Sequence, residues 1–319
     1  MSLDWRLFCE LRRLSASPVW QVESHPNIPK LAAKIRTSAN TVWRRLKEWR
    51  RLGFLGPPVF LPNPRLFGLG FEFSQLVVSD PAARNELLDR LELVDGVVQA
   101  SIDYGNVVSL VTVADSPTSR ARRLKLLGDL PGVSRAETLF PLWLPTPTRS
   151  LRTSDVQLID ELRRSPEAPI TQLGKALGVS GSTISRRFHR LRSTGAMLTY
   201  RIEDFSRFPS TVAVLELAVA HAIESRRAAE EIAKEFPDLL ELTAMSRPPF
   251  ASHKFLDFLA EVENVSQIAE LEARLAKVAS VTTVSNRLPG GERVYEGWIL
   301  NRMHELLSAH QQVLDNQRS

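Results

Sequence analysis

The segment 180–194 reads SGSTISRRFHRLRST and combines small hydroxyl side chains with a run of arginines. An arginine guanidinium can donate two parallel hydrogen bonds to a base edge or a phosphate. At about 100° per residue, Ile184, Phe188 and Leu191 share one face of a helix. The residues of this segment that could contact a polyanion are Ser182, Thr183, Arg186, Arg187, His189 and Arg190. The spacing therefore predicts an amphipathic helix with a basic outward face.

A second segment, residues 38–52, reads SANTVWRRLKEWRRL and has the same phase, with Val42, Leu46 and Trp49 inward. The candidate DNA contacts of this segment are Asn40, Thr41, Arg44, Arg45, Lys47 and Arg51. Small polar residues followed by arginines suit a helix whose N-terminal end enters the major groove while later cations neutralise phosphates. One such segment alone is equally well explained as a solvated surface helix, but two in the same phase favour DNA binding.

The two segments belong to an internal duplication. DWRLFCELRR (4–13) aligns without gaps on DVQLIDELRR (155–164), and six of the ten positions are identical. Further along, LAAKIRTSANTVWRRLKEWRRLGFL (31–55) aligns on LGKALGVSGSTISRRFHRLRSTGAM (173–197). The chain is therefore predicted to be a tandem repeat, with one basic helix in each copy.

The basic residues follow the duplication. The 319 residues carry a net charge of only +5, but residues 1–60 hold eleven Lys and Arg against four Asp and Glu. Residues 150–200 hold eight against four, and the remaining segments are neutral to acidic. Positive charge clustered in this way is typical of a surface that binds a polyanion.

Other chemistry has little support in the sequence. The single cysteine, Cys9, cannot form an internal disulfide and is expected to be a helical residue without special chemistry. The six histidines lack metal-ligand spacing, and we recognise no catalytic triad, phosphate-binding loop or paired-carboxylate motif. No apolar run is long enough to cross a membrane, and no signal peptide is evident. We therefore expect a cytoplasmic protein that is not an enzyme and needs no cofactor or metal.

Each basic helix must be positioned by its neighbours, and the second copy indicates how. Ser154 is expected to cap a helix over residues 155–163, with Gln157 in the reciprocal position of a capping box. A second short helix ends at Gly178, and one of the serines that follow opens the third. Residues 197–205 alternate like a strand and could form a wing.

The rest of each copy reads strand–helix–strand–strand–helix–strand, which is the ferredoxin-like pattern. We therefore predict an α+β fold in which two winged helix-turn-helix domains alternate with two ferredoxin-like (βαββαβ) domains, followed by a C-terminal helix. The GG of LPGGERV (288–294) is interpreted as a turn. The expected boundaries are 1–66 and 155–208 for the helix-turn-helix domains, 67–145 and 209–290 for the ferredoxin-like domains, 146–154 for the linker and 291–319 for the C-terminal helix.

The residues LGKALGVSGSTISRRFHRLRSTG resemble the helix-turn-helix of the Lrp/AsnC (feast/famine) transcription regulators, and the chain resembles a tandem fusion of two such units. In that family a winged helix-turn-helix binds DNA, and a ferredoxin-like domain mediates dimerisation and often senses amino acids. The first copy departs from the family pattern, because Arg36 stands where Gly178 makes the turn and Trp43 replaces Ser185. SIDYGN (101–106) matches the family's effector loop only loosely. We assign no amino-acid effector, although a small-molecule effector at the αβ domains stays open.

The resemblance implies a sequence-specific transcription regulator that binds double-stranded DNA. Its two recognition helices, roughly 39–52 and 182–194, would read two non-identical half-sites, and its ferredoxin-like domains would associate as an internal pseudo-dimer or a homodimer. Siroheme decarboxylases, built from the same modules, are the enzymatic alternative. Their His-Asn-Tyr-type element has no counterpart in ASIDYGNVVSLVTV, and His253 alone lies near the matching strand of the second copy. A helix-turn-helix that serves protein assembly is the other alternative.

Overall fold

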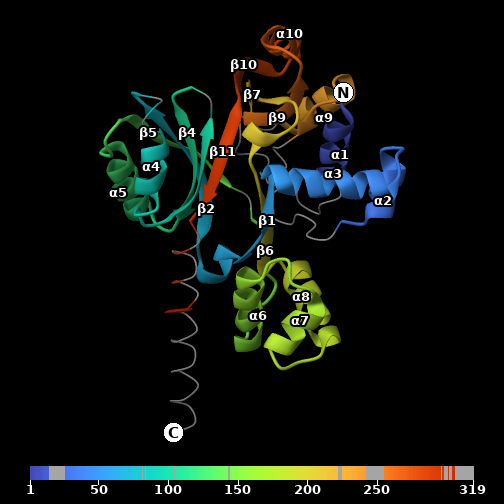
Figure 1. Cartoon of the computed structure of the whole chain (residues 1–319). Coiled ribbons are helices and arrows are strands. Elements are labelled where there is room, and N and C mark those ends of the chain that lie inside the picture. Colours follow the sequence, from blue (N-terminus) through green and yellow to red (C-terminus); the bar gives the residue numbers. More distant parts are fainter. Residues whose placement is uncertain are drawn as a thin grey trace. The chain divides into compact units, whose positions relative to one another are not determined.

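The computed structural model (Figure 1) describes the chain except for a set of short segments and the C-terminal end. The residues outside the description are 14–25, 81, 83, 104, 143, 222–224, 242–254, 296, 298–300, 302–303 and 306–319. His253 and most of the expected C-terminal helix therefore lie outside it. The described chain forms two compact units.

The first unit joins the helix-turn-helix of the first repeat to the αβ elements of the second. It comprises residues 1–56, 101–107 and 200–292. Its helix-turn-helix consists of α1 (Leu3–Arg13), α2 (Ile28–Lys34) and α3 (Ala39–Leu52). Its αβ elements are β7 (Thr211–Val219), α9 (Ser225–Glu235), β8 (Leu240–Glu241), β9 (Phe255–Val262), α10 (Val265–Leu275) and β10 (Val281–Arg287). The strands lie in the order β10-β7-β9-β8, which confirms the predicted βαββαβ topology.

A hydrophobic core joins the helix-turn-helix of this unit to its sheet. Trp49 of α3 and Phe8 of α1 meet Phe208, which precedes the first strand of the sheet. Phe54 also packs on Phe208, with ring centroids 4.7 Å apart. The same core reaches Val214 of β7. The first helix-turn-helix is therefore anchored on the sheet of the second repeat by aromatic packing.

The second unit combines the opposite halves and comprises residues 57–100, 108–199 and 293–319. Its αβ elements are β2 (Gly70–Val78), α4 (Arg84–Leu91), β3 (Val97–Asp103), β4 (Val107–Ala114), α5 (Pro117–Gly128) and β5 (Val133–Leu142). Its helix-turn-helix consists of α6 (Thr153–Arg164), α7 (Ile170–Ala176) and α8 (Gly181–Ser193). The strand order β11-β3-β4-β2-β5 contains the predicted ferredoxin-like arrangement with one strand added.

The added strand, β11 (Pro289–Val294), corrects two expectations. The two glycines expected in a turn lie inside this strand, and the segment expected to begin the C-terminal helix is extended. A Cβ on Gly290 would lie 2.4 Å from the Ile102 carbonyl oxygen, so glycine permits the close approach of β11 to β3. Tyr295 then donates its hydroxyl to the Leu88 carbonyl at 2.7 Å.

The strands that follow the two helix-turn-helix segments, β1 (Leu55–Pro62) and β6 (Met197–Glu203), pair in a two-stranded sheet. The predicted strand after the third helix of the second helix-turn-helix is therefore present. Within the second unit, the buried amide of Asn63 donates to the carbonyl oxygens of Pro145 (2.7 Å) and Gly195 (2.6 Å). This amide therefore satisfies carbonyl groups of two loops that would otherwise be buried without donors.

The start of α6 differs from the expected one. The helix begins at Thr153, and its N-cap is Arg152 rather than Ser154. Asp155, not Gln157, fills the reciprocal position, because its carboxylate accepts the backbone N–H of Arg152 at 3.1 Å. No helix in the described part of the chain is long and apolar enough to cross a membrane.

Candidate nucleic-acid interface

The turn before α8 depends on two glycines. Gly178 has a φ of 65°, in the left-handed region that glycine adopts without strain. A Cβ on Gly174 would lie 2.7 Å from the Val179 carbonyl oxygen, so this position also requires the smallest residue. Ser180 then caps α8 by accepting the backbone N–H of Thr183 at 3.3 Å. These contacts fix the point at which the N-terminal end of α8 emerges.

The faces of α8 follow the predicted phase. Ile184 and Leu191 are buried and Phe188 is half-buried against Phe60. Among the candidate contact residues, the exposed ones are Ser182, Arg186 and His189, and the half-buried ones are Thr183, Arg187 and Arg190. The first turn carries no acidic residue, so the positive end of the helix dipole is not neutralised there.

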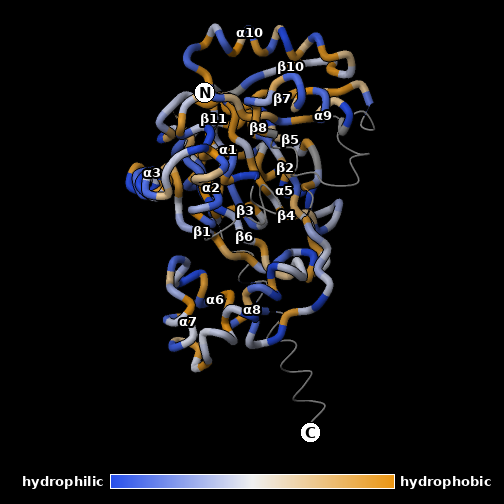
Figure 2. The backbone as a smooth tube through the Cα atoms, turned by 90° about the vertical axis from the view of Figure 1, so that its right-hand side faces the viewer, coloured by the Kyte–Doolittle hydropathy of each residue, from blue (hydrophilic) through white to orange (hydrophobic). Residues whose placement is uncertain are grey.

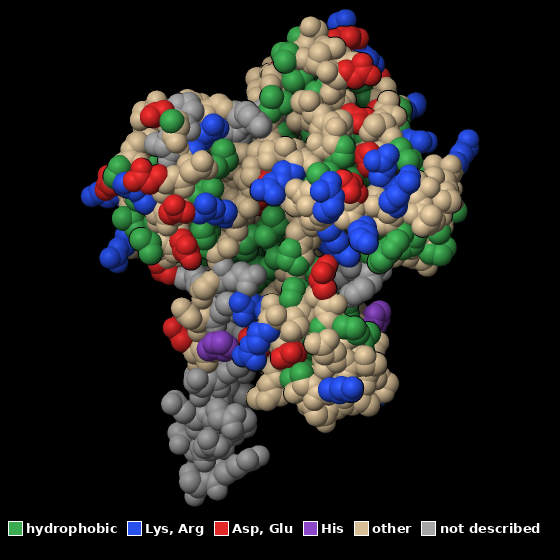
Figure 3. Space-filling view, viewed as in Figure 1, with side chains coloured by type: hydrophobic (Ala, Val, Ile, Leu, Met, Phe, Trp, Pro, Cys, Tyr) green, Lys and Arg blue, Asp and Glu red, His purple; other side chains and the backbone are tan. Residues whose placement is uncertain are grey.

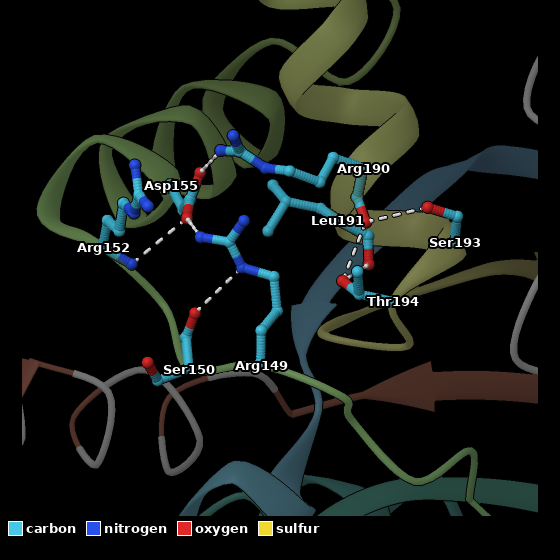
Figure 4. Close-up of polar contacts among 8 residues, drawn as sticks. All are labelled: Arg149, Ser150, Arg152, Asp155, Arg190, Leu191, Ser193 and Thr194. Atoms are coloured by element: carbon cyan, nitrogen blue, oxygen red, sulfur yellow. Dashed lines mark hydrogen bonds and ion pairs between the residues drawn. The ribbon is translucent and has the colours of Figure 1, made fainter.

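The side chain of Arg190 is turned toward α6 (Figure 4). It donates to Oδ1 of the fully buried Asp155 at 2.7 Å. Arg149 approaches Oδ2 of the same carboxylate at 3.3 Å. A buried carboxylate needs such partners, because ionised groups are costly to bury alone. Arg190 therefore holds α8 to α6, and α8 has one fewer arginine available for DNA than its sequence suggests.

The corresponding helix of the first copy, α3, also has the predicted faces. Ser38 caps it by accepting the backbone N–H of Thr41 at 3.0 Å. Val42, Leu46 and Trp49 are buried. The exposed candidates are Asn40, Arg44, Lys47 and Arg51, and the half-buried ones are Thr41 and Arg45. Figure 2 shows α3 largely hydrophilic, and Figure 3 shows lysine and arginine side chains gathered over it.

Two arginines of α3 already have partners. Arg45 lies 3.4 Å from Oδ2 of Asp4. The other oxygen of this carboxylate, Oδ1, accepts the Trp49 indole N–H at 2.9 Å. Arg51 donates from Nε and Nη2 to both oxygens of Glu48, at 3.0 and 2.6 Å. The hydrogen bond from Arg51 lowers the pKa of Glu48, so this carboxylate is ionised beside the arginine. Among the candidate cations of α3, Arg44 and Lys47 have no ion pair within the described residues.

The turn of the first helix-turn-helix is strained where the second is not. Arg36 has a φ of 55°, and it is the one non-glycine residue with positive φ in the described part of the chain. It stands where the second copy has Gly178. An L-residue in the left-handed region costs about 1–2 kcal/mol. The sequence difference at this position is thus accommodated by strain rather than by a different turn.

Two aspartates that the sequence reading did not select organise these segments. Asp4 and Asp155 are aligned in the duplication and buried in their respective units. The sequence did carry a signal for them, because both aligned blocks have an aspartate at this position. A carboxylate on an otherwise apolar helix face needs a partner. Periodicity could not identify that partner. Arg149, for example, lies in the linker rather than in a helix.

A pair of glutamates lies at the end of β6 in the first unit. Glu203 is buried and forms an ion pair with Arg12 of α1. Glu292 accepts the backbone N–H of Glu203 at 3.3 Å and the hydroxyl of Tyr200 at 3.4 Å. Burial raises the pKa of Glu203, and it raises the pKa of Glu292 to about 8. Glu292 is therefore mostly protonated at neutral pH, and the pair ties α1 to β6.

The described residues give no metal cluster of three or more His, Cys, Asp or Glu side chains. Cys9 is buried, and burial raises the pKa of its thiol to about 12. A cavity of about 870 Å³ in the first unit is lined by the start of α1, by α10 and by the adjoining ends of β7 and β9. Its charged lining consists of Asp238, Glu261, Glu263, Glu270 and Arg274. Such a lining disfavours an anionic ligand.

Comparisons with known proteins identify the second helix-turn-helix and the overall fold. Residues 154–192 match the AsnC-type helix-turn-helix domain. Among curated proteins, no sequence matches the chain.

Among solved structures, the crystal structure of the siroheme decarboxylase NirDL is similar, with a TM-score of 0.52 and 12% identity over 97% of this chain and 100% of that one. NirDL in complex with an iron-uroporphyrin III analogue gives the same score and identity over 97% and 99%. AsnC of E. coli is similar over 44% of this chain and 92% of its own, with a TM-score of 0.33 and 12% identity. The likeness to NirDL, which extends over nearly the full length of both chains, confirms the α+β fold with two helix-turn-helix and two ferredoxin-like modules.

Proposed function

We propose that the chain is a sequence-specific DNA-binding transcription regulator of the Lrp/AsnC type. The observation that carries the proposal is the outward face of α8, where Ser182, Arg186 and His189 are exposed on an AsnC-type helix-turn-helix. A capped helix end with small polar residues, followed by an arginine, suits insertion into the major groove. The first copy would read a second, non-identical half-site, because Lys47 and Arg51 of α3 correspond to His189 and Ser193 of α8.

The experiment is selection of bound fragments from a random DNA pool with the full-length protein, followed by affinity measurements at several salt concentrations. Affinity should fall with salt by about 0.9 log units per phosphate neutralised per tenfold salt. Arg186→Ala should weaken binding by about 1–3 kcal/mol if the arginine bonds a base bidentately. Arg135→Ala is the matched control, because Arg135 is an exposed arginine of β5 far along the chain from either recognition helix.

Failure of the full-length protein to retard any genomic fragment would contradict the proposal. If the protein bound no DNA but self-associated through exposed residues of α3 or α8, the helix-turn-helix segments would serve protein assembly instead. Sedimentation of the wild type and of the Arg186→Ala variant separates these outcomes. The same experiment measures whether two chains associate, as the expected homodimer requires.

A siroheme-decarboxylase-like enzyme is the second candidate, and the full-length likeness to NirDL favours it. The carboxylate-rich cavity of the first unit is unsuited to a tetrapyrrole with several carboxylates, which requires cationic partners, whereas a pocket of the second unit lined by Arg65 and Arg149 offers such partners. Titration with siroheme or an iron porphyrin, followed by absorbance, tests it directly. Stoichiometric binding with a spectral shift would support the enzyme, whereas no shift together with specific DNA binding would support the regulator.

A further inference from the structure

Trp43 occupies an unusual position for an aromatic residue. It lies on α3 and is 56% exposed, whereas Trp49 of the same helix is completely buried. The corresponding position of α8 is the exposed Ser185. Single apolar residues are common on protein surfaces. This one, however, lies on the helix that the duplication marks as a recognition helix.

The neighbours of Trp43 are polar or cationic. Asn40 lies one turn before it and Lys47 one turn after it, so both are adjacent on the helix surface. Both are exposed, as is Arg44. In total α3 carries five basic residues and one acidic residue. An aromatic side chain inside a cationic surface is complementary to DNA, whose phosphates attract the cations while its base edges offer apolar contacts.

The chemistry of the major groove narrows the contact. The C5-methyl of thymine is the one apolar group that base pairs present there, and apolar side chains read it. Trp43 follows the Ser38 cap by five residues, so it lies in the N-terminal half of α3. That half is the part of a recognition helix that approaches base edges.

We propose that Trp43 is a specificity-determining residue that contacts a thymine methyl group, so that the first half-site requires thymine at one position. The inference rests on the proposed DNA binding. The second half-site has no equivalent requirement, because Ser185 can offer only a hydroxyl group.

The test uses the full-length protein and a DNA sequence selected from a random pool. Each thymine of that sequence is replaced in turn by deoxyuridine, which lacks only the methyl group. Removing the contacted methyl should weaken binding about fourfold, the effect expected for one buried methyl-sized group. In Trp43→Ser the same replacement should change nothing, whereas Trp43→Phe should keep the preference.

Two further variants are the controls. Lys47→Ala should weaken binding equally to the thymine and deoxyuridine sequences, since phosphate contacts carry no methyl preference. Ser185→Trp should create a methyl preference in the second half-site. Thermal unfolding of Trp43→Ser should match the wild type, because the side chain is exposed.

The possible results distinguish a failure of the Trp43 role from a failure of the proposed DNA binding. Specific binding with no methyl preference at any thymine would overturn the role of Trp43 and leave the proposed function intact. The same holds if Trp43→Ser abolishes self-association while DNA affinity is unchanged, because the tryptophan would then contact protein. Absence of specific DNA binding by the wild type would overturn both.

Discussion

The two helix-turn-helix segments keep the same buried acceptor but use different donors. In the first, Asp4 accepts the neutral indole N–H of Trp49 at 2.9 Å. In the second, Asp155 accepts the guanidinium of Arg190 at 2.7 Å. The position aligned with Arg190 is Glu48. This glutamate does not pair with the buried aspartate and instead accepts a hydrogen bond from the exposed Arg51. Duplication thus preserved the carboxylate and exchanged what satisfies it.

The exchange changes which cations α3 and α8 present to solvent, and so what each could offer in the proposed DNA binding. α8 uses Arg190 internally and keeps Arg186 exposed. α3 pairs Arg51 with a glutamate and keeps Arg44 and Lys47 without ion pairs in the described chain. A count of arginines is therefore a poor guide to the number of cations that each helix presents without an internal partner.

The largest expected effect concerns the pH dependence of the first unit. Glu292 has a pKa of about 8 in the folded protein, above the ordinary value of 4.5 that it regains on unfolding. The folded state therefore holds the extra proton between these values, and its stability is lost as pH rises from about 4.5 to 8. We expect the free energy of unfolding to fall by about 2–4 kcal/mol across this window. Hydrogen exchange of α1 amides, which Arg12 links to the pair, measures the change.

Glu292→Gln is the control for this prediction. A glutamine keeps the acceptor oxygen for the Tyr200 hydroxyl and cannot ionise. The pH dependence between 4.5 and 8 should therefore shrink in this variant. An equally steep loss of stability in Glu292→Gln would show that another group is responsible.

The next effect compares the two buried aspartates. Asp155→Ala leaves two guanidinium groups, those of Arg190 and Arg149, facing each other without an acceptor. We expect a loss of about 2–3 kcal/mol, reduced from the fully buried case because both arginines are partly exposed. Asp4→Ala removes the acceptor of the neutral Trp49 indole N–H and the longer ion pair with Arg45. The loss of stability should therefore be about 1–2 kcal/mol. Denaturant unfolding of the full chain that shows equal losses would contradict the contrast.

A smaller effect separates the arginines of α3 by DNA affinity. Arg44→Ala should weaken binding by about 1 kcal/mol and reduce the salt slope by about one contact. Arg51→Ala should have a smaller effect on the salt slope, because Glu48 already neutralises that guanidinium. Titration of the selected DNA at three salt concentrations gives both slopes. A larger slope change for Arg51→Ala would indicate that the intrahelical pair opens on binding.

Hydrophobic periodicity was sufficient to predict the helices of both helix-turn-helix segments, their faces and the strand–helix order of both ferredoxin-like sheets. It predicted that Ile184 and Val42 lie inward because neighbours three and four residues apart determine a helix face. It did not predict β11, because glycines in sequence indicate a turn unless a distant strand approaches them closely. Gly290 makes such an approach to Ile102.

The candidate site was predicted in part for the same reason. Exposure of Arg186 and Arg44 follows from phase within one helix. The partners of Arg190 and Arg45 lie on other helices, 35 residues away in the case of Arg190, and no local pattern encodes such contacts. The strain at Arg36 was visible as a departure from glycine, whereas its φ of 55° required the structure.

The smallest expected effect concerns the turns of the two helix-turn-helix segments. It tests whether they differ only in having Arg36 where the second turn has Gly178. Arg36→Gly removes the cost of a side chain at a φ of 55° but gives the unfolded chain more freedom, so we expect a net gain of about 0.5–1 kcal/mol. The reciprocal change, Gly178→Ala, should lose a comparable amount, since nothing lies within 4 Å of a Cβ there and only the backbone conformation opposes it. Thermal unfolding of the two variants measures both signs. A loss of stability in Arg36→Gly would show that the Arg36 side chain makes a contribution larger than its strain, and the two turns would then differ in more than one residue.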